Sequence, residues 1–261
     1  MKKKKVIIVI GSVSAALLIG LCIFLFRKMH NPKELTVWYK DNPVTVNVTD
    51  NYDYTGLWEK IRDIDSSERS KYLEVPEELL IKMSTPGLLI TCLEYSKYTS
   101  VFSYSSYLQG YNNVKEYYNG LRELISRPDF PETIFNFYLA LDYKKVQKSD
   151  EGGPVRIVYL DFIMSDPEVA SKFTHQQYVE LIHRCKENIL LFKDKYKSDV
   201  FHVGAEGRLL ANLLYYDNPE FRNYVDTTDG LKTFVDGESF GIGHDADGYF
   251  KRIWEIVTGY Y

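Results

Sequence analysis

Hydrophobic residues recur every three or four positions over most of the chain after residue 50. The clearest example is segment 174–196, where Thr174 and Gln177 have the spacing of a capping box. The apolar stripe that follows consists of Tyr178, Ile182, Cys185, Ile189, Phe192 and Tyr196. This spacing puts all of its members on one face of a helix, and that face has to be buried. The pattern therefore predicts a long amphipathic helix.

A proline followed by a glutamate opens each of four further apolar-periodic runs. Proline is preorganised for the first helical turn, and glutamate there suits the helix dipole. The pairs begin at Pro76, Pro131, Pro167 and Pro219. Their spacing is too uneven for a strict repeat array. The pattern predicts an all-α domain over residues 50–261, in which helical hairpins of unequal length pack together, with a solenoid-like stack as one arrangement.

Hydrophobic and polar residues alternate one by one just before this helical region. Two such runs, Leu35–Tyr39 and Val44–Val48, are rich in β-branched residues and flank the turn-forming Asp41-Asn42-Pro43. Alternation with a period of two on both sides of a turn is typical of paired strands. The sequence predicts a small β-hairpin over residues 35–49.

A third pattern begins the chain, where Val6–Phe26 is a run of 21 residues without a charge. A bilayer core of about 30 Å needs about 20 apolar residues in a helix, so this run has the required length. Lys2–Lys5 precede it, and the positive-inside bias then puts residues 1–5 in the cytoplasm. The pattern predicts a single-pass transmembrane signal anchor, a linker over residues 27–34, and extracytoplasmic residues after about residue 30.

A cleaved signal peptide is the alternative for the same segment. Ser14-Ala15-Ala16 has the small residues that a cleavage site requires. Cleavage there would leave only Val6–Val13 as the apolar region and would begin the mature chain with largely apolar residues. An uncleaved anchor is favoured for this reason, and cleavage stays open.

Charge changes the expected partners. The first 30 residues carry six basic side chains and no acidic one, so the remainder has 26 Lys+Arg against 36 Asp+Glu, a formal net charge of −10. Nucleic acids are bound through clustered cations, so this acidic balance argues against a nucleic-acid partner. A hydrophobic content of 45% indicates a packed core.

Outside the uncharged run there are two cysteines, Cys92 and Cys185. Both lie in apolar helical stripes, which favours buried thiols, although a bridge between them stays open.

The segment Val75–Asp129 resembles a segment that recurs in uncharacterised exported proteins of bacteria, especially gut bacteria. The residues that carry the resemblance are Pro76–Thr85, Gly87-Leu88, Thr91–Tyr95, Asn119–Leu124 and Arg127. The resemblance covers about a quarter of the chain after the anchor. It implies a bacterial, exported helical domain and attaches no activity to it.

Two motifs resemble parts of metal sites. Glu180 and His183 have the spacing of half of a di-iron motif, but no second pair accompanies them, so a solvated pair on a helix is expected. Asp245–Gly248 resembles the middle of a calcium loop. Gly243 stands at the first ligand position and Trp254 stands where the bidentate glutamate should be, so a flexible loop is expected. The sequence predicts neither a metal site nor a cofactor.

No catalytic set can be assembled from the sequence. Cys185 and His183 are two residues apart on a predicted helix and would point to different faces, so they cannot form an activated pair. The alternative is a cell-envelope hydrolase with dispersed residues, His202, Glu206, His244 and Asp245. That hypothesis requires two histidines to meet a carboxylate in one pocket.

Tyrosine is the least ordinary component, with 22 residues in the chain. Tyr104, Tyr107 and Tyr111 are expected on one helical face, either exposed to stack on sugars and proteins or buried between helices. The leading hypothesis is a non-catalytic, membrane-tethered extracytoplasmic binding module with a protein or glycan partner. A scaffold that depends on a bound cation is a third possibility.

Overall fold

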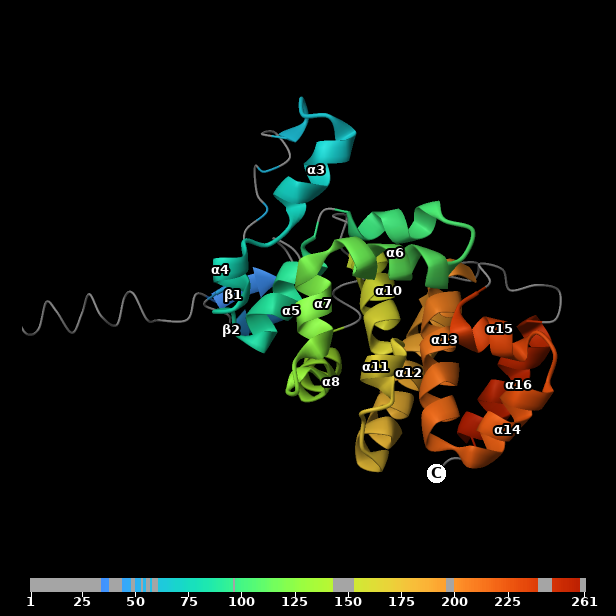
Figure 1. Cartoon of the computed structure of the whole chain (residues 1–261). Coiled ribbons are helices and arrows are strands. Elements are labelled where there is room, and N and C mark those ends of the chain that lie inside the picture. The colour runs from blue at the N-terminus through green and yellow to red at the C-terminus, as the bar shows by residue number, and fades with distance from the viewer. Residues whose placement is uncertain are drawn as a thin grey trace, which may run out of the picture. The chain divides into compact units, whose positions relative to one another are not determined.

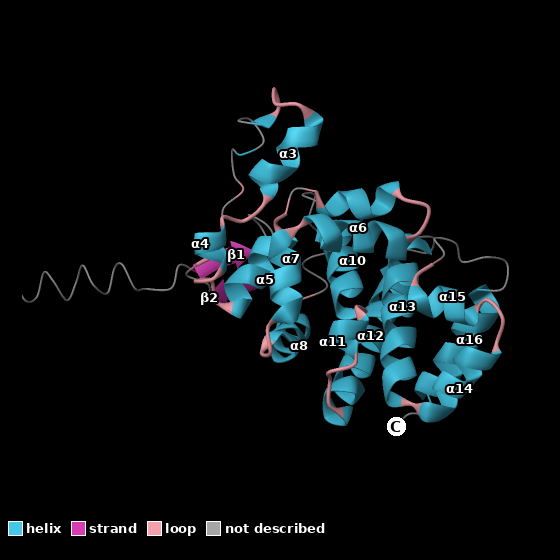
Figure 2. Cartoon of the chain, viewed as in Figure 1, coloured by secondary structure: helices cyan, strands magenta, loops and turns pink. Residues whose placement is uncertain are grey.

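The helical region has the predicted all-α architecture (Figure 1, Figure 2). The structure is a computed structural model that describes residues 34–37, 44–47, 50–52, 54, 57, 61–95, 97–142, 153–195, 200–238 and 246–258. Its helices are α3 (Ser66–Leu73), α4 (Glu77–Leu80), α5 (Thr85–Leu93), the 3₁₀ helix η1 (Tyr98–Ser103), α6 (Tyr107–Tyr117), α7 (Asn119–Ser126), α8 (Phe130–Ala140), α10 (Gly153–Met164), α11 (Pro167–Ala170), α12 (His175–Lys195), α13 (Val200–Asp217), α14 (Pro219–Thr227), α15 (Leu231–Asp236) and α16 (Ala246–Thr258).

The predicted helix starts are confirmed. Each of the four proline–glutamate pairs lies at the beginning of a helix, namely α4, α8, α11 or α14. Asp166 caps α11 by accepting a hydrogen bond from the Glu168 backbone N–H (2.9 Å). At the start of α12, the Thr174 backbone N–H donates to Gln177 Oε1 (2.9 Å), and the Gln177 backbone N–H donates to Thr174 Oγ1 (3.3 Å). Local sequence alone therefore determines where these helices begin.

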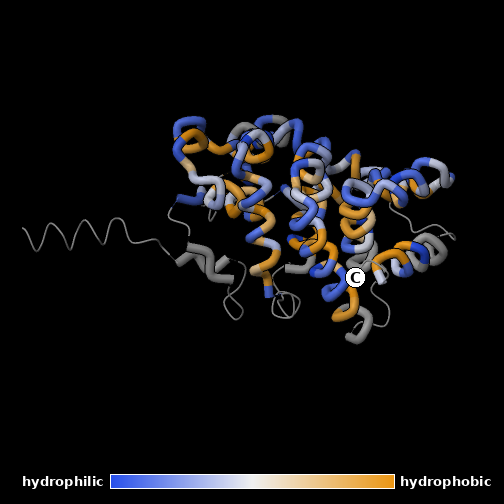
Figure 3. The backbone as a smooth tube through the Cα atoms, turned by 90° about the horizontal axis from the view of Figure 1, so that it is seen from below, coloured by the Kyte–Doolittle hydropathy of each residue, from blue (hydrophilic) through white to orange (hydrophobic). Residues whose placement is uncertain are grey.

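The core forms where α12 and α10 pack against α13. The predicted stripe of α12 is buried as far as its side chains are described, from Tyr178 to Ile189. On α13 the described side chains between Ala205 and Leu214 are all buried. A helix that is buried all round must have neighbours on several sides, and α13 also contacts α11, α14 and α15. Figure 3 shows hydrophobic and hydrophilic stretches alternating along the helices.

Cys92 and Cys185 are both free and both fully buried. The prediction of two buried thiols is therefore confirmed, and a disulfide between them is excluded. Burial raises the pKa of each thiol above its usual range. A thiol with a raised pKa in an apolar environment is a poor nucleophile.

One prediction about the tyrosines is wrong. α6 begins at Tyr107, because the Ser106 side chain caps it by accepting a hydrogen bond from the Gln109 backbone N–H (3.1 Å). Tyr104 comes before this cap, in extended backbone, and so does not share the helical face. Tyr107 and Tyr111 do share it, and both are buried. Of the two alternatives, exposure for stacking and burial between helices, the structure therefore shows burial for Tyr107 and Tyr111.

The N-terminal part of the chain is described only in two short strands. They are β1 (Glu34–Val37) and β2 (Val44–Asn47), which pair in a two-stranded sheet. The turn predicted between them lies outside the described residues, so the β-hairpin over residues 35–49 stays a prediction. The chain divides into two compact units, residues 1–35 with 45–49 and residues 36–44 with 50–261. Everything below concerns the second unit.

The predicted localisation, a single-pass membrane protein, is corrected by the structure. Within the described ranges no helix is long and apolar enough to cross a membrane. The longest, α12, has 21 residues, but charged side chains such as Glu180, Arg184 and Glu187 interrupt it, and a spanning helix needs about 20 predominantly apolar residues. Val6–Phe26 lies outside the described residues.

Candidate functional site

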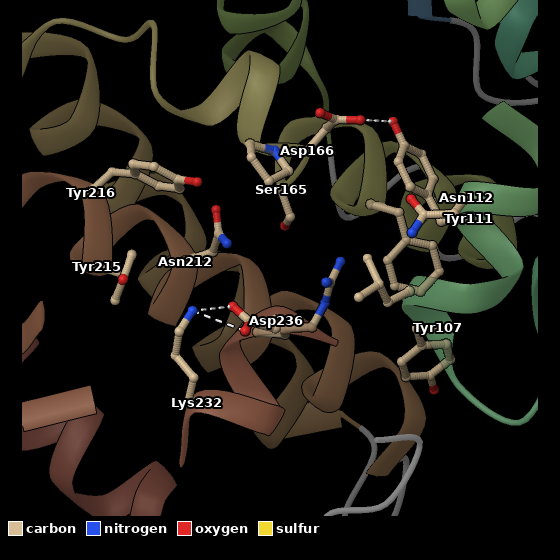
Figure 4. Close-up of a pocket in the computed structure, with 14 residues that line it drawn as sticks. Tyr107, Tyr111, Asn112, Ser165, Asp166, Asn212, Tyr215, Tyr216, Lys232 and Asp236 are labelled. Carbon is tan, nitrogen blue, oxygen red and sulfur yellow. Dashed lines mark hydrogen bonds and ion pairs between the residues drawn. The ribbon is translucent and has the colours of Figure 1, made fainter. Parts of the chain in front are cut away.

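A cavity of about 340 Å³ lies among α6, the junction of α10 and α11, α13 and α15. We name it the tyrosine cavity. It is lined by Tyr107, Leu108, Tyr111, Asn112, Phe162, Ser165, Asp166, Pro167, Arg208, Asn212, Tyr215, Tyr216, Lys232 and Asp236. Figure 4 shows Tyr107, Tyr111 and Asn112 on one wall and Asn212, Tyr215 and Tyr216 on the facing wall. Each helix contributes residues at helical spacing, so the cavity is a product of how the faces meet.

The α6 wall is held by Asp166, which lies at the junction of α10 and α11. Its carboxylate accepts hydrogen bonds from Tyr111 Oη (2.9 Å) and from Lys115 Nζ (2.8 Å), in addition to capping α11. Lys115 Nζ also pairs with Glu168 (2.7 Å). Burial works to lower the pKa of Lys115, but the bonds to the two carboxylates raise it above its ordinary value. The lysine therefore stays charged, and Asp166 is fully engaged by its neighbours.

The α15 side carries a second ion pair. Lys232 Nζ lies 2.7 Å and 2.9 Å from the two carboxylate oxygens of Asp236, one helical turn later (Figure 4). The same Nζ lies 4.8 Å from the centroid of the Tyr215 ring, within the range of a cation–π contact. Both charges of this pair therefore already have partners.

Arg208 differs from the other charged groups of the cavity. Its side chain is buried, and its guanidinium stacks 4.7 Å from the centroid of the Phe162 ring. In the part of the chain that the structure describes, it forms no hydrogen bond and no ion pair. Burial lowers the pKa of Arg208 to about 10, with attraction to Asp161 acting in the opposite direction. At neutral pH the tyrosine cavity thus contains a buried guanidinium that carries charge but has no acceptor.

The backbone leaves room for this guanidinium at one glycine. Gly237 ends α15 with a φ of 78°, in the left-handed region that favours glycine. A Cβ atom at this position would lie only 2.5 Å from Nη1 of Arg208. The Gly237 carbonyl also accepts a hydrogen bond from the Leu108 backbone N–H (2.9 Å), which ties α15 to α6. The glycine is therefore required by both the turn and the arginine.

Asn212 lies one helical turn after Arg208 on α13 and also lines the cavity. Its Oδ1 is buried and has no hydrogen-bond partner among the described residues. A buried amide oxygen without a donor costs about 1–3 kcal/mol. Arg208 and Asn212 therefore place one unsatisfied donor and one unsatisfied acceptor on the same wall of the cavity.

A second polar cluster lies in the core between α8, α10, α12 and α13. Tyr138 Oη donates to Glu206 Oε1, and Asn188 Nδ2 donates to the same oxygen (3.1 Å). Burial raises the pKa of Asp161 well above its ordinary value, and the Glu206 carboxyl beside it adds to the rise. Two adjacent buried carboxylates cannot readily both be charged, so the proton is held more tightly at Asp161 than in an exposed aspartate.

Of the residues predicted for a hydrolase, only Glu206 has a described side chain, and it does not line the tyrosine cavity. Glu206 is fully buried in the core cluster. The His202 side chain, His244 and Asp245 lie outside the described residues, so their arrangement stays a prediction. On α12, His183 is exposed, and Glu180 accepts a hydrogen bond from Gln176 Nε2 (2.7 Å). No group of three metal-ligating side chains is found in the described ranges.

The sequence interpretation did not single out Arg208, Asn212, Asp166 or Lys232 as site residues. One signal was present, because a glutamate and an arginine interrupt the otherwise mostly apolar segment 205–214 of α13. A charge within such a segment indicates a buried polar site. No family model matches the chain, and comparisons with curated proteins and with solved structures found no match. The resemblance over Val75–Asp129 therefore stays a prediction.

Proposed function

We propose that the protein is a non-catalytic binding module that holds a small polar ligand, of the size of one sugar ring, in the tyrosine cavity. The observation that carries this proposal is a concave site with buried polar groups, Arg208 and Asn212, that have no partner among the described residues. Small-molecule sites combine aromatic and apolar walls with a few convergent polar groups, and their volumes begin at about 300 Å³. Four tyrosines and Phe162 supply those walls.

Asn112 and Pro167 are the exposed lining residues, and the ligand enters beside Asn112 of α6. Tyrosine rings present a flat apolar face and a hydroxyl, a combination that suits the faces and hydroxyls of a sugar. The tyrosine cavity contains no free thiol, and its carboxylates are engaged in ion pairs. These features favour holding a ligand over transforming it.

Thermal unfolding of the full chain with a panel of neutral and acidic monosaccharides tests the proposal. A ligand at 100 times its Kd adds about 2.7 kcal/mol of stability, which corresponds to a Tm increase of about 5–10 °C for a chain of this size. Asn112→Phe fills the opening and should abolish the increase. Gln109→Phe adds the same ring to an exposed position of α6 that does not line the cavity, and should preserve it.

Two results would contradict the proposal. One is a panel in which no member raises the Tm of the wild-type chain. The other is an equal Tm increase in Asn112→Phe and Gln109→Phe, which would place the ligand elsewhere. The bound sugar should also be recovered chemically unchanged after prolonged incubation, and its conversion would favour the hydrolase alternative.

A further inference from the structure

The charges around the tyrosine cavity are paired except for one. Lys232 pairs with Asp236, and Asp166 binds Lys115. Arg208 lies among them without an ion pair to any described residue. Leaving a charge buried without a partner is costly, so such groups are normally paired. Positive and negative residues around the cavity balance in number, because Lys115 takes two of the carboxylates, so Arg208 is left as a guanidinium without an ion-pair partner among the described residues.

Asp161 does not serve as the ion-pair partner of Arg208. Asp161 attracts Arg208 over a distance, but no ion pair joins them in the described structure. Burial and the adjacent Glu206 carboxyl raise the pKa of Asp161 well above its ordinary value, which weakens it as a counter-charge. Among the described residues the guanidinium therefore has no acceptor, and a ligand in the tyrosine cavity would supply one.

The geometry of the Arg208 guanidinium indicates which kind of anion would bind it. A guanidinium presents its donors as a planar fork, and a carboxylate matches this fork with two parallel hydrogen bonds. One positive charge is balanced by one carboxylate. A phosphate dianion would bring two negative charges into a site whose two lysines, Lys232 and Lys115, already face three carboxylates, those of Asp236, Asp166 and Glu168.

Asn212 adds a second requirement, because it needs a hydrogen-bond donor and not an acceptor. Its buried Oδ1 lacks a donor, and it lies one turn from Arg208 on the same helix. A ligand that satisfies both residues carries a hydroxyl donor close to its carboxylate. The tyrosine walls then contact the rest of its body.

From this combination we infer that the tyrosine cavity binds a hydroxylated monocarboxylate, such as an acidic sugar or a smaller hydroxy acid, with Arg208 binding the carboxylate and Asn212 accepting from the hydroxyl. This inference rests on the proposed function and names the ligand class of the same site. It adds that affinity depends on one negative charge, which the proposed function alone does not require.

Isothermal titration of the full chain with matched probes tests the inference. D-glucuronate and D-glucose share the same ring and differ at C6, where one has a carboxylate and the other a hydroxymethyl group. Loss of a hydrogen bond to a charged group weakens binding about 10- to 100-fold, so glucuronate should bind more tightly than glucose by this factor. D-glucose 6-phosphate should bind no better than glucose, and L-lactate tests whether a smaller hydroxy acid suffices.

Variants of Arg208 test whether this residue causes the preference for glucuronate over glucose. Arg208→Met keeps the length of the side chain and should abolish the preference for glucuronate over glucose, whereas Arg208→Lys keeps the charge without the fork and should retain part of it. Because a substitution in the core could impair folding, the Tm of each variant without ligand is measured first. The ranking of the four probes on the wild-type chain does not depend on any variant.

The outcomes separate the inference from the proposed function. Equal affinity for glucuronate and glucose overturns the inference but leaves a neutral-ligand binding module standing. Tighter binding of glucose 6-phosphate than of glucuronate overturns the assignment of a monocarboxylate. If neither glucuronate nor lactate binds, the inference fails, and a Tm increase with any neutral sugar then decides whether the proposed function survives.

Discussion

Two tyrosine-rich regions of the helical body use their tyrosines differently. In the region of α5 and α7, the rings of Tyr95 and Tyr118 are stacked 3.9 Å apart between centroids and only 7° from parallel. The Tyr54 hydroxyl hydrogen-bonds to Tyr118 Oη (2.9 Å) and donates to the Leu73 carbonyl (3.2 Å). In the tyrosine cavity, Tyr107, Tyr111, Tyr215 and Tyr216 instead surround open space.

The difference extends to the groups beside the tyrosines. The region of α5 and α7 gains stability from hydroxyls that satisfy one another in a closely packed cluster. On the α13 wall of the tyrosine cavity, by contrast, the buried atoms Arg208 Nε and Asn212 Oδ1 have no hydrogen-bond partner among the described residues. A region that retains such unsatisfied groups sacrifices stability, and sites that bind ligands commonly do so. The comparison distinguishes tyrosines that serve the fold from those that surround a site.

Tyr118→Ala is expected to have the largest effect. It removes a fully buried ring, its stacking on Tyr95 and the hydroxyl partner of Tyr54, and should cost about 3–5 kcal/mol of unfolding free energy, measured by urea denaturation. Tyr117→Ala removes an exposed ring from the neighbouring position and should cost less than about 0.5 kcal/mol. A similar loss in both variants would show that the stacked cluster is not a main source of stability.

Asp161→Asn tests the core cluster behind the tyrosine cavity through the pH dependence of stability. Because burial raises the pKa of Asp161 in the folded state, the folded protein keeps a proton that the unfolded chain releases above about pH 4. Stability should therefore fall as pH rises above this value, with a slope of up to about 1.4 kcal/mol per pH unit, until the folded pKa is passed.

The asparagine cannot ionise, so the variant should lose this slope and be more stable than the wild type at neutral pH. Urea denaturation between pH 4 and pH 8 measures both slopes. Asp129→Asn changes an exposed carboxylate whose Oδ1 accepts from Thr85 Oγ1 (2.7 Å), and it should leave the slope as in the wild type. Parallel curves for Asp161→Asn and the wild type would contradict a raised pKa of Asp161 in the folded state.

Arg208→Met is expected to have the smallest effect on stability, and its sign is informative. Removing a buried charge that lacks an ion pair should leave the unfolding free energy unchanged or raise it by about 1 kcal/mol. Measured without ligand, a loss of more than about 2 kcal/mol would show that Arg208 supports the fold. The polar groups of the tyrosine cavity would then stabilise the fold, as those of the α5–α7 region do.

The sequence by itself determined the helical character of the chain and the places where its helices begin. Proline fixes one backbone dihedral angle, and capping side chains bind N–H groups three or fewer residues away, so the starts of α11, α12 and α14 need no tertiary information. The buried stripe of α12 followed from spacing for the same reason. These signals are local, and they act before any two helices meet.

The tertiary structure decided what the buried polar residues do. Arg208 and Asn212 share a face of α13, which the sequence implies, but their lack of partners depends on α6, α10 and α15 meeting α13 around a cavity. Tyr118 and Tyr111 belong to the same tyrosine-rich segment, yet one stacks on Tyr95 and the other binds Asp166, 55 residues away in the chain. Hydrogen bonding and desolvation depend on which groups lie within a few ångströms, and only the packing of distant helices determines that.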